Sequence, residues 1–342
     1  MRVVKLLLFA FVLVSAAGSV FASGTNEKGG STTQPQKPII LRYAHVGMPG
    51  EDQTRYAAEF AARVNKETNG QVQVQVFPNS QLGGQNEILN GVKSGSIAMT
   101  QGDYALLATY VPDFAVMDAP YVFTSGAQAL RATGPSSPIV EKLNKELVAK
   151  AGIRLIANFY RGARELTANV PIYKPRDLVG KRLRAVPIPL WTSMIKGMGA
   201  TPVPVNVSEL ETALMTGVVI GQENPINMIQ SAKLYEAQKY VMMTNHMYSV
   251  LAVFINEGTW EKIPKGDQQT IEKIAQDMAQ LSLQWNKEST AQMKAKLESE
   301  GMTFIDQSNG LDVAAFRAAV QKQINHDFPT WGPIMKELEA VK

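Results

Sequence analysis

Three arginines lie in or beside two predicted strands, at positions where an α/β protein often binds its ligand. Arg161 and Arg164 follow a predicted strand over 153–160, and Arg184 lies inside a second predicted strand over 181–186. A guanidinium group can make two parallel hydrogen bonds to one carboxylate, which lysine cannot reproduce. A single arginine in such a strand is as often a salt-bridge partner or a solvent-exposed side chain. Two arginines from separate strands, however, indicate an anion-binding site.

An asparagine is the natural third member of this site. In the segment 216–225, TGVVIGQENP, a predicted apolar strand ends in Gln222, Glu223 and Asn224, and Pro225 restricts the backbone of Asn224. A carboxamide both donates and accepts hydrogen bonds, so Asn224 could bind a carboxylate oxygen or a neighbouring hydroxyl. We expect Gln222 and Glu223 to cap nearby backbone groups and to act as scaffold.

The sequence gives little support for an enzyme. It contains three histidines and no cysteine, and no histidine has the spacing of a metal-ligand motif. No Gly-x-Ser-x-Gly nucleophile motif occurs, and paired acids such as Glu209 and Glu211 are explained by helix capping. We therefore expect no catalytic residue, no metal and no cofactor. An exported enzyme on the same scaffold and a sensory ligand-binding protein remain the alternatives.

The first 22 residues have the pattern of a secretory signal peptide. Arg2 and Lys5 precede the apolar run 6–14, and small residues lead to Ala22. Residues 23–37 read as a polar, flexible tether. No later segment is apolar for long enough to span a bilayer, so we expect an exported, soluble mature chain. The formal net charge of +4 is too small to argue for nucleic-acid binding.

Alternating strand and helix patterns predict two α/β lobes of similar size. The predicted strands cover 39–46, 71–77, 97–100, 153–160, 181–186 and the apolar segment from 216, and the predicted helices cover 52–66, 86–94, 189–199 and 208–217. A capping box from Ser208 to Glu211 would open the last of these helices. One long helix over 263–299 should lie along both lobes, since apolar residues recur every three or four positions at Ile271, Ile274, Met278, Leu281 and Trp285.

An ordered set of segments resembles the solute-binding proteins of TRAP (tripartite ATP-independent periplasmic) transporters, of the DctP type. The segments are RYAHV (42–46), DAPYVF (118–123), GARELT (162–167), DLVGKRLRAVP (177–187), GMGATPVPV (197–205), SELETAL (208–214), GQENP (221–225) and KLYEAQKYVMMTNH (233–246). They extend over nearly the whole mature chain. The sequence departs from the family pattern at Ile220, where an aspartate is usual, and this change is expected to alter packing and not the binding residues.

The resemblance implies a binding site for a small organic acid. It places the principal carboxylate-binding arginine at Arg164, a second arginine at Arg184 and an orienting amide at Asn224, whereas Arg161 has no firm counterpart. A sugar acid such as a uronate is slightly favoured, and a C4-dicarboxylate or a 2-oxo acid is the alternative. The other predicted ligand contacts are His45 in the loop after the first strand, Trp191 and Tyr160 as apolar or stacking walls, and Gln101 and Tyr104.

The resemblance also implies a two-lobed periplasmic-binding-protein fold with mixed, mainly parallel sheets and a long helix spanning both lobes. The expected division is 38–160 with 250–300 for lobe 1, 161–249 for lobe 2, and 301–342 for a C-terminal segment packed on the lobes. Hinge crossovers near 157–163 and 245–253 would let the lobes close on the ligand. The protein is then a periplasmic monomer that delivers its ligand to the membrane subunits of a TRAP permease.

Overall fold

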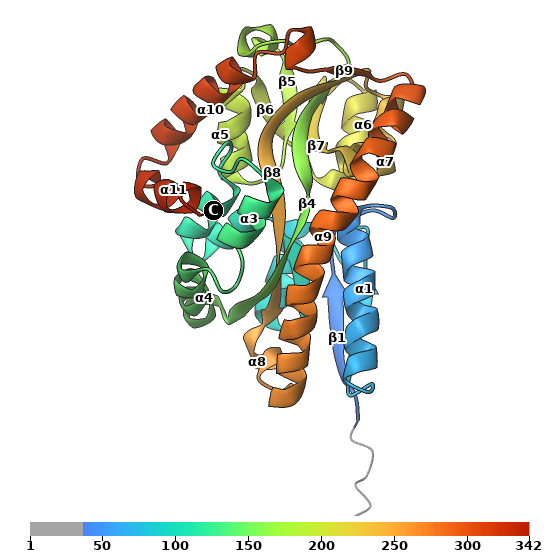
Figure 1. Ribbon diagram of the computed structural model, residues 1–342, viewed down its shortest axis with the longest axis vertical. Helices are drawn as coiled ribbons and strands as arrows, with labels where there is room; N and C mark the ends of the chain where they lie inside the picture. Colours follow the sequence, from blue (N-terminus) through green and yellow to red (C-terminus); the bar gives the residue numbers. More distant parts are fainter. Residues whose placement is uncertain (1–36, 342) are drawn as a thin grey trace, which may run out of the picture. The chain divides into compact units, whose positions relative to one another are not determined.

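One nine-stranded mixed sheet runs through residues 37–341, the part of the chain that the computed structural model describes (Figure 1). The strands are β1 Ile39–Ala44, β2 Val72–Phe77, β3 Met99–Gly102, β4 Ile153–Ala168, β5 Arg182–Ala185, β6 Thr201–Pro204, β7 Gly221–Pro225, β8 Tyr240–Asn256 and β9 Thr303–Ile305. Their order is β2-β1-β3-β8-β4-β7-β5-β6, and β9 pairs with β8. The predicted signal peptide (1–22) lies outside the described residues, as does the predicted tether (23–37) except for Lys37.

Helices cover the sheet and connect its strands. The α-helices are α1 Asp52–Glu67, α2 Gln85–Ser94, α3 Gly126–Ala132, α4 Pro138–Ala151, α5 Pro189–Gly197, α6 Leu210–Met215, α7 Ile226–Ser231, α8 Glu257–Trp260, α9 Lys265–Ser299, α10 Val313–Asp327 and α11 Gly332–Glu339. Short 3-10 helices include η1 Tyr104–Thr109, η2 Pro112–Asp118 and η4 Val207–Glu209. None of the helices within 37–341 is both long and apolar enough to cross a membrane.

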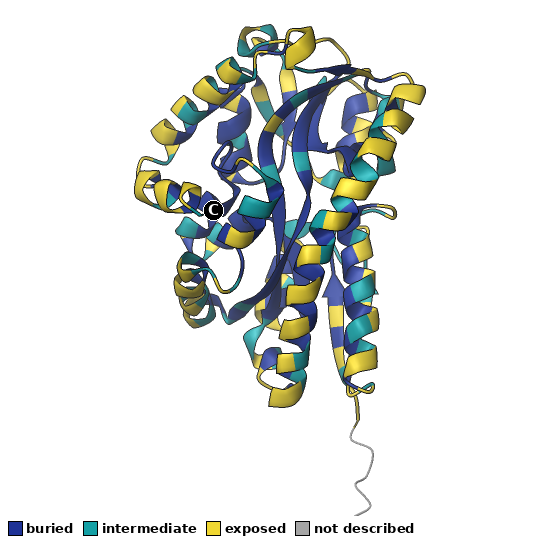
Figure 2. Ribbon diagram, in the orientation of Figure 1, coloured by how far each residue is buried: buried dark blue, intermediate teal, exposed yellow. Residues whose placement is uncertain are grey.

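Two long antiparallel strands, β4 and β8, form the centre of the sheet and join its two halves. The strands β1 and β3 continue the sheet beyond β8, and β7 and β5 continue it beyond β4, with parallel pairs outside this centre. Figure 2 shows both long strands buried along most of their length, with exposed positions concentrated on the outer faces of the helices. The predicted mixed α/β architecture is therefore confirmed, and the two halves share one continuous sheet.

The strand predicted over 153–160 is much longer than the sequence pattern indicated. It continues to Ala168, so Arg161 and Arg164 are strand residues and do not follow the strand. The polar composition of residues 161–168, RGARELTA, is typical of a loop, but every residue there except Ala163 is buried. Over this stretch β4 pairs with both β7 and β8. Tertiary pairing thus overrides the local pattern.

The segment 216–225 also differs from its prediction. The strand is the polar part, Gly221–Pro225, whereas Val218 is exposed in the turn before it. The expected capping box is not formed: Glu209 stands at the N-cap of α6 and its side chain makes no capping hydrogen bond. The buried polar side chains of this strand need hydrogen-bond partners. The partners of Glu223 include Arg164, which belongs to the candidate site described below.

The predicted long helix is present as α9, close to the expected 263–299. The buried residues include Ile271, Ile274, Met278 and Trp285, as the apolar spacing indicated. It packs along β4, α1 and α7 and so runs beside both halves of the sheet (Figure 1). The C-terminal segment adds β9 to the sheet and lays α10 against α5.

Candidate functional site

Arg164 lies in the middle of the sheet, on β4, and its guanidinium is completely buried. The neighbouring strand β7 brings Glu223 to it, because Leu166 of β4 is the register partner of Glu223. Arg164 Nε donates to Glu223 Oε2, and Nη2 donates to Oε1 at 2.7 Å and to the Glu223 backbone oxygen at 2.9 Å. The sequence analysis predicted that this edge of the guanidinium binds a ligand carboxylate. In the structure, the same edge binds the carboxylate of Glu223.

Glu223 is the centre of a buried hydrogen-bond network behind the cavity described below. Trp191 Nε1 donates to Glu223 Oε1 at 2.9 Å, and His246 Nε2 lies 2.9 Å from Oε2. Burial lowers the pKa of His246, so its imidazole is neutral at pH 7, with Nε2 donating to Glu223 and Nδ1 accepting from Thr244 at 2.8 Å. Burial alone would raise the pKa of Glu223, but the charge and hydrogen bonds of Arg164, with His246, hold it well below its usual range.

Only one nitrogen of the Arg164 guanidinium lacks a hydrogen-bond partner. This nitrogen is Nη1, and it is buried. Because arginine keeps its proton in proteins, Nη1 can only donate. Arg164 lines a cavity between the two halves of the sheet, so a ligand that reaches this arginine would meet it at Nη1.

Arg184 on β5 supplies a positive charge without a protein counter-ion. Its Nε donates to the Val205 backbone oxygen at 2.9 Å, and no carboxylate in the described part of the chain lies within salt-bridge distance of it. The side chain is 3% exposed. Burial lowers the pKa of Arg184 to about 10 against the opposing attraction of Glu223, so the group remains charged at neutral pH.

Arg161 reaches the same cavity because β4 bulges at this residue. A regular strand would place Arg161 and Arg164 on opposite faces, but the register with β8 shifts between Tyr160 and Gly162 and leaves Arg161 as the extra residue. Arg161 Nε donates to Ser249 at 3.0 Å, and Nη2 lies 3.5 Å from Asp103 Oδ1. The family resemblance offered Arg161 no firm counterpart, and a bulge has no clear signature in a single sequence.

These three arginines line one small cavity. Its other polar lining residues are Glu51, Gln53, Gln85, Gln101, Asp103 and Asn224, and its apolar walls are Val46, Val186, Val207, Met228 and Leu251. The space open to the centre of a water molecule is only about 30 Å³, enough for about two waters. The residues come from both halves of the sheet, so a larger ligand can enter only if the halves move apart or the lining side chains move.

Four of the eight predicted contact residues line this cavity and four do not. Arg164, Arg184, Asn224 and Gln101 line it. Asn224 Nδ2 donates to Gln222 Oε1 at 2.6 Å, and Gln101 Nε2 donates to the Gln53 backbone oxygen at 2.8 Å. Gln222 in turn donates to Thr167 at 2.8 Å, so Gln222 supports Asn224 and Glu223 supports Arg164 through side-chain bonds, not as backbone caps.

The other four predicted contacts are buried elsewhere. Trp191 lies behind Arg164, with its ring 5.5 Å from the guanidinium carbon. Tyr104 donates to the Thr133 backbone oxygen at 2.5 Å, and the Tyr160 ring packs against Gly126. His45 Nδ1 accepts from the Gly47 backbone at 3.1 Å, and burial lowers the pKa of His45 to about 4.

The acidic and amide residues Glu51, Gln53, Gln85 and Asp103 were missed by the sequence reasoning. Asp103 follows directly after β3, the strand predicted over 97–100, and this position at a strand end is the signal that could have revealed it. Glu51 accepts from the Met48 backbone at 2.8 Å and from Gln53, and burial raises the pKa of its carboxyl. Within residues 37–341, no cluster of three or more histidine or acidic side chains could hold a metal ion.

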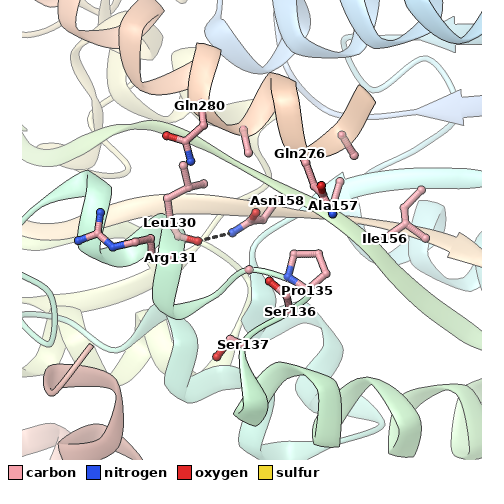
Figure 3. Close-up of a pocket in the computed structure, with 13 residues that line it drawn as sticks. Leu130, Arg131, Pro135, Ser136, Ser137, Ile156, Ala157, Asn158, Gln276 and Gln280 are labelled. Carbon is pink, nitrogen blue, oxygen red and sulfur yellow. Dashed lines mark hydrogen bonds between the residues drawn. The ribbon is translucent and has the colours of Figure 1, made fainter. Parts of the chain in front are cut away.

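A second cavity lies between α9, β4 and the loop that joins α3 to α4, with about 320 Å³ of open space (Figure 3). Its lining includes Asn158, Gln276 and Gln280, and Asn158 already donates to the Leu130 backbone oxygen at 2.9 Å. Arg131 is its one charged lining residue among those described, and Figure 3 shows its guanidinium turned away from Asn158 and the glutamines. The cavity with three buried arginines is therefore the better candidate site.

Comparison with known proteins agrees with this choice. Residues 43–328 match the family model described as bacterial extracellular solute-binding protein, family 7. A TRAP periplasmic solute-binding protein from Roseobacter denitrificans, solved with bound L-galactonate, is 33% identical with a TM-score of 0.81, over 88% of this chain and 99% of that chain.

Two further matches carry different ligands. A TRAP periplasmic solute-binding protein from Xanthobacter autotrophicus, solved with bound β-D-galacturonate, is 27% identical with a TM-score of 0.80, over 88% of this chain and 100% of that chain. The C4-dicarboxylate-binding periplasmic protein of Rhodobacter capsulatus is 33% identical over 69% of this chain and 71% of its own length.

Proposed function

Because the chain belongs to family 7 of the bacterial extracellular solute-binding proteins, we propose that it captures a small sugar acid outside the cytoplasm and delivers it to the membrane subunits of a TRAP permease. In this proposal the signal peptide is removed on export, and the mature chain works as a periplasmic monomer. The relatives solved with L-galactonate and β-D-galacturonate support an aldonate or a uronate as the ligand.

The observation that carries the proposal is the uncompensated charge of Arg184 beside the free donor of Arg164. A buried guanidinium without a counter-ion is unfavourable until an anion arrives. A ligand carboxylate between Arg184 and Arg164 would form an ion pair with the Arg184 guanidinium. It would also accept a hydrogen bond from Arg164 Nη1. Asn224, which lines the same cavity, would hold the neighbouring oxygen of the ligand. The clamp is therefore divided between two arginines, and Glu223 keeps Arg164 in place.

Ligand capture would couple to movement of the two lobes. The cavity is too small for a sugar acid as it stands, and β4 and β8 are the long strands that cross between the halves of the sheet. The proposed hinge segments, 157–163 and 245–253, both fall within these strands, and the bulge at Arg161 lies in the first of them. Bending at this bulge would open the cavity without separating the strands.

The proposed role is binding without turnover. His246, the buried histidine behind the cavity, has both ring nitrogens engaged by Glu223 and Thr244. That arrangement supports a fixed structural role, because a general base needs a nitrogen free to accept a substrate proton.

A thermal-shift panel of uronates, aldonates, C4-dicarboxylates and 2-oxo acids tests the proposal. A sugar acid at about 100 times its Kd should raise the free energy of unfolding by about 2.7 kcal/mol. Chromatography of the released compound should return it unchanged. Absence of stabilisation by every carboxylate, or conversion of the bound acid, would overturn the proposal.

A further inference from the structure

Two buried polar atoms on the lining of the arginine cavity have no hydrogen-bond partner. One is Arg164 Nη1 and the other is Asp103 Oδ1. Asp103 is 2% exposed, and its nearest cation, Arg161 Nη2, lies at 3.5 Å, which is an ion-pair contact and not a hydrogen bond. The other Asp103 oxygen, Oδ2, has a partner, because it accepts from Gln85 Nε2 at 3.4 Å.

The two atoms require opposite partners. Arg164 Nη1 can only donate, so it requires an acceptor such as a carboxylate oxygen. A carboxylate oxygen such as Asp103 Oδ1 accepts, so it requires an O–H or N–H donor. A buried polar group that stays unpaired after binding loses much of the affinity that the other contacts provide.

The charges around the cavity also favour a ligand with a single carboxylate. Three arginines line it, and Asp103 and Glu223 compensate Arg161 and Arg164. Arg184 is left without a paired carboxylate, because the remaining acidic lining residue, Glu51, bonds the Met48 backbone and Gln53. One ligand carboxylate would pair with Arg184, whereas a second would face the carboxylates of Asp103 and Glu51.

We propose that Asp103 is the specificity-determining residue of the site and that it selects hydroxy acids with a single carboxylate. The ligand carboxylate meets Arg184 and Arg164 Nη1, and a ligand hydroxyl donates to Asp103 Oδ1. Straight-chain acids without hydroxyls leave Asp103 unpaired, and dicarboxylates bring a second negative charge towards it. This inference rests on the proposed binding of a sugar acid at this site.

Isothermal titration of the wild-type mature protein with matched ligands tests the inference directly. L-galactonate is compared with hexanoate and D-erythronate with butyrate, so that each pair shares a carbon chain and differs in its hydroxyls, and succinate serves as the dicarboxylate. We expect hexanoate, butyrate and succinate to bind at least about a hundredfold more weakly than the tighter of the two sugar acids. Binding of any of the three within tenfold of that sugar acid would overturn the inference while leaving carboxylate capture in place.

The variant Asp103→Asn tests the residue itself. It keeps the size of the side chain but removes the charge, so it should bind the preferred sugar acid at least about tenfold more weakly. Succinate should bind more tightly than to the wild type, because the charge of Arg161 is then uncompensated. Asp277→Asn, on the exposed face of α9, is the matched control and should change neither affinity.

The outcomes separate the two proposals. Unchanged selectivity in a folded Asp103→Asn protein would overturn the role of Asp103, and the wild-type ligand comparison stands even if this variant does not fold. Failure of the wild type to bind any of the five acids and any member of the wider carboxylate panel would overturn the binding function together with the inference.

Discussion

The Arg164 guanidinium and the Glu223 carboxylate pair inside the sheet with neither side chain exposed to solvent. The strand register makes this pair, since β7 runs beside β4 with Glu223 opposite Leu166. Trp191 and His246 complete the hydrogen bonding of the Glu223 carboxylate. An arginine held in this way cannot turn toward a ligand, so a ligand bound at Arg164 would have to reach its one nitrogen without a partner, Nη1.

Glu223→Gln should strongly destabilise the fold. The variant leaves the buried Arg164 charge without its counter-ion, and breaking a buried pair from one side typically costs about 3–5 kcal/mol. The free energy of unfolding from urea titration is the measurement. Glu337→Gln on the exposed surface of α11 is the control and should stay within about 0.5 kcal/mol of the wild type. Equal free energies of unfolding for both variants would show that the Arg164–Glu223 pair contributes little to stability.

Arg184→Lys should weaken ligand binding while leaving the fold intact. Lysine keeps the charge but loses the planar pair of donors, so we expect a loss of at least about 1.4 kcal/mol, or tenfold in Kd. Arg182→Lys is the matched control, because Arg182 lies on the same strand with an exposed side chain that bonds only the Gly217 backbone oxygen. Titration calorimetry with the preferred sugar acid distinguishes them. Identical affinities would remove Arg184 from the ligand contacts.

Glu165→Gln should stabilise the protein on the alkaline side of neutrality. Burial raises the pKa of Glu165 from 4.5 to about 8, against hydrogen bonds from the Asn245 and Thr244 backbone. Between these values the folded state holds the proton more tightly than the unfolded state, so stability falls as pH rises, by up to about 1.4 kcal/mol per pH unit. The variant removes this slope. Urea titrations from pH 5 to 8 should give a flatter profile than the wild type, and parallel profiles would contradict the assignment.

His45→Asn should act on the acidic side, with the opposite sign. Burial lowers the pKa of His45 from 6.5 to about 4, so the unfolded state binds more protons between these values and stability falls as pH decreases through them. The variant should therefore lose less stability than the wild type between pH 6.5 and 4. His326→Asn is the control, since the His326 side chain is 81% exposed. If both variants follow the wild-type profile, His45 titrates normally.

Gly221→Ala should disrupt the approach of β7 to β4. A Cβ at this position would lie 2.2 Å from the Thr167 backbone oxygen, which cannot move without breaking the strand pair. We expect a loss of about 1–3 kcal/mol in the free energy of unfolding, together with weaker ligand binding as Glu223 shifts. Gly266→Ala at the start of α9 meets no atom within 4 Å and is the control. Substitution there should be neutral or slightly stabilising.

The sequence allowed the α/β architecture, the long helix and three residues of the candidate cavity to be predicted, because each has a local signal. Apolar residues at three- and four-residue spacing marked α9, and Arg164, Arg184 and Asn224 stood in recognisable segments. All three line the same cavity.

The rest depended on contacts between distant residues. Glu223 looked like a scaffold residue because nothing near it in sequence reveals that Arg164 lies on the neighbouring strand. The bulge that turns Arg161 into the cavity exists only through the register with β8. Asp103 is a candidate site residue because it lines the cavity beside Arg161, and a single aspartate after a strand is too common a feature to interpret alone.

The central position of β8 also governs when the molecule can fold. The strand β3 pairs with β8, and β4 pairs with β8 along nearly its whole length, yet β8 begins only at Tyr240. A shorter fragment would expose the hydrogen-bonding edges of β3 and β4, which are ready templates for aggregation. The first half of the sheet thus depends on pairing with a strand from the last third of the chain, and such long-range pairing slows folding. We therefore expect folding to be completed only after residues 240–256 have been synthesised.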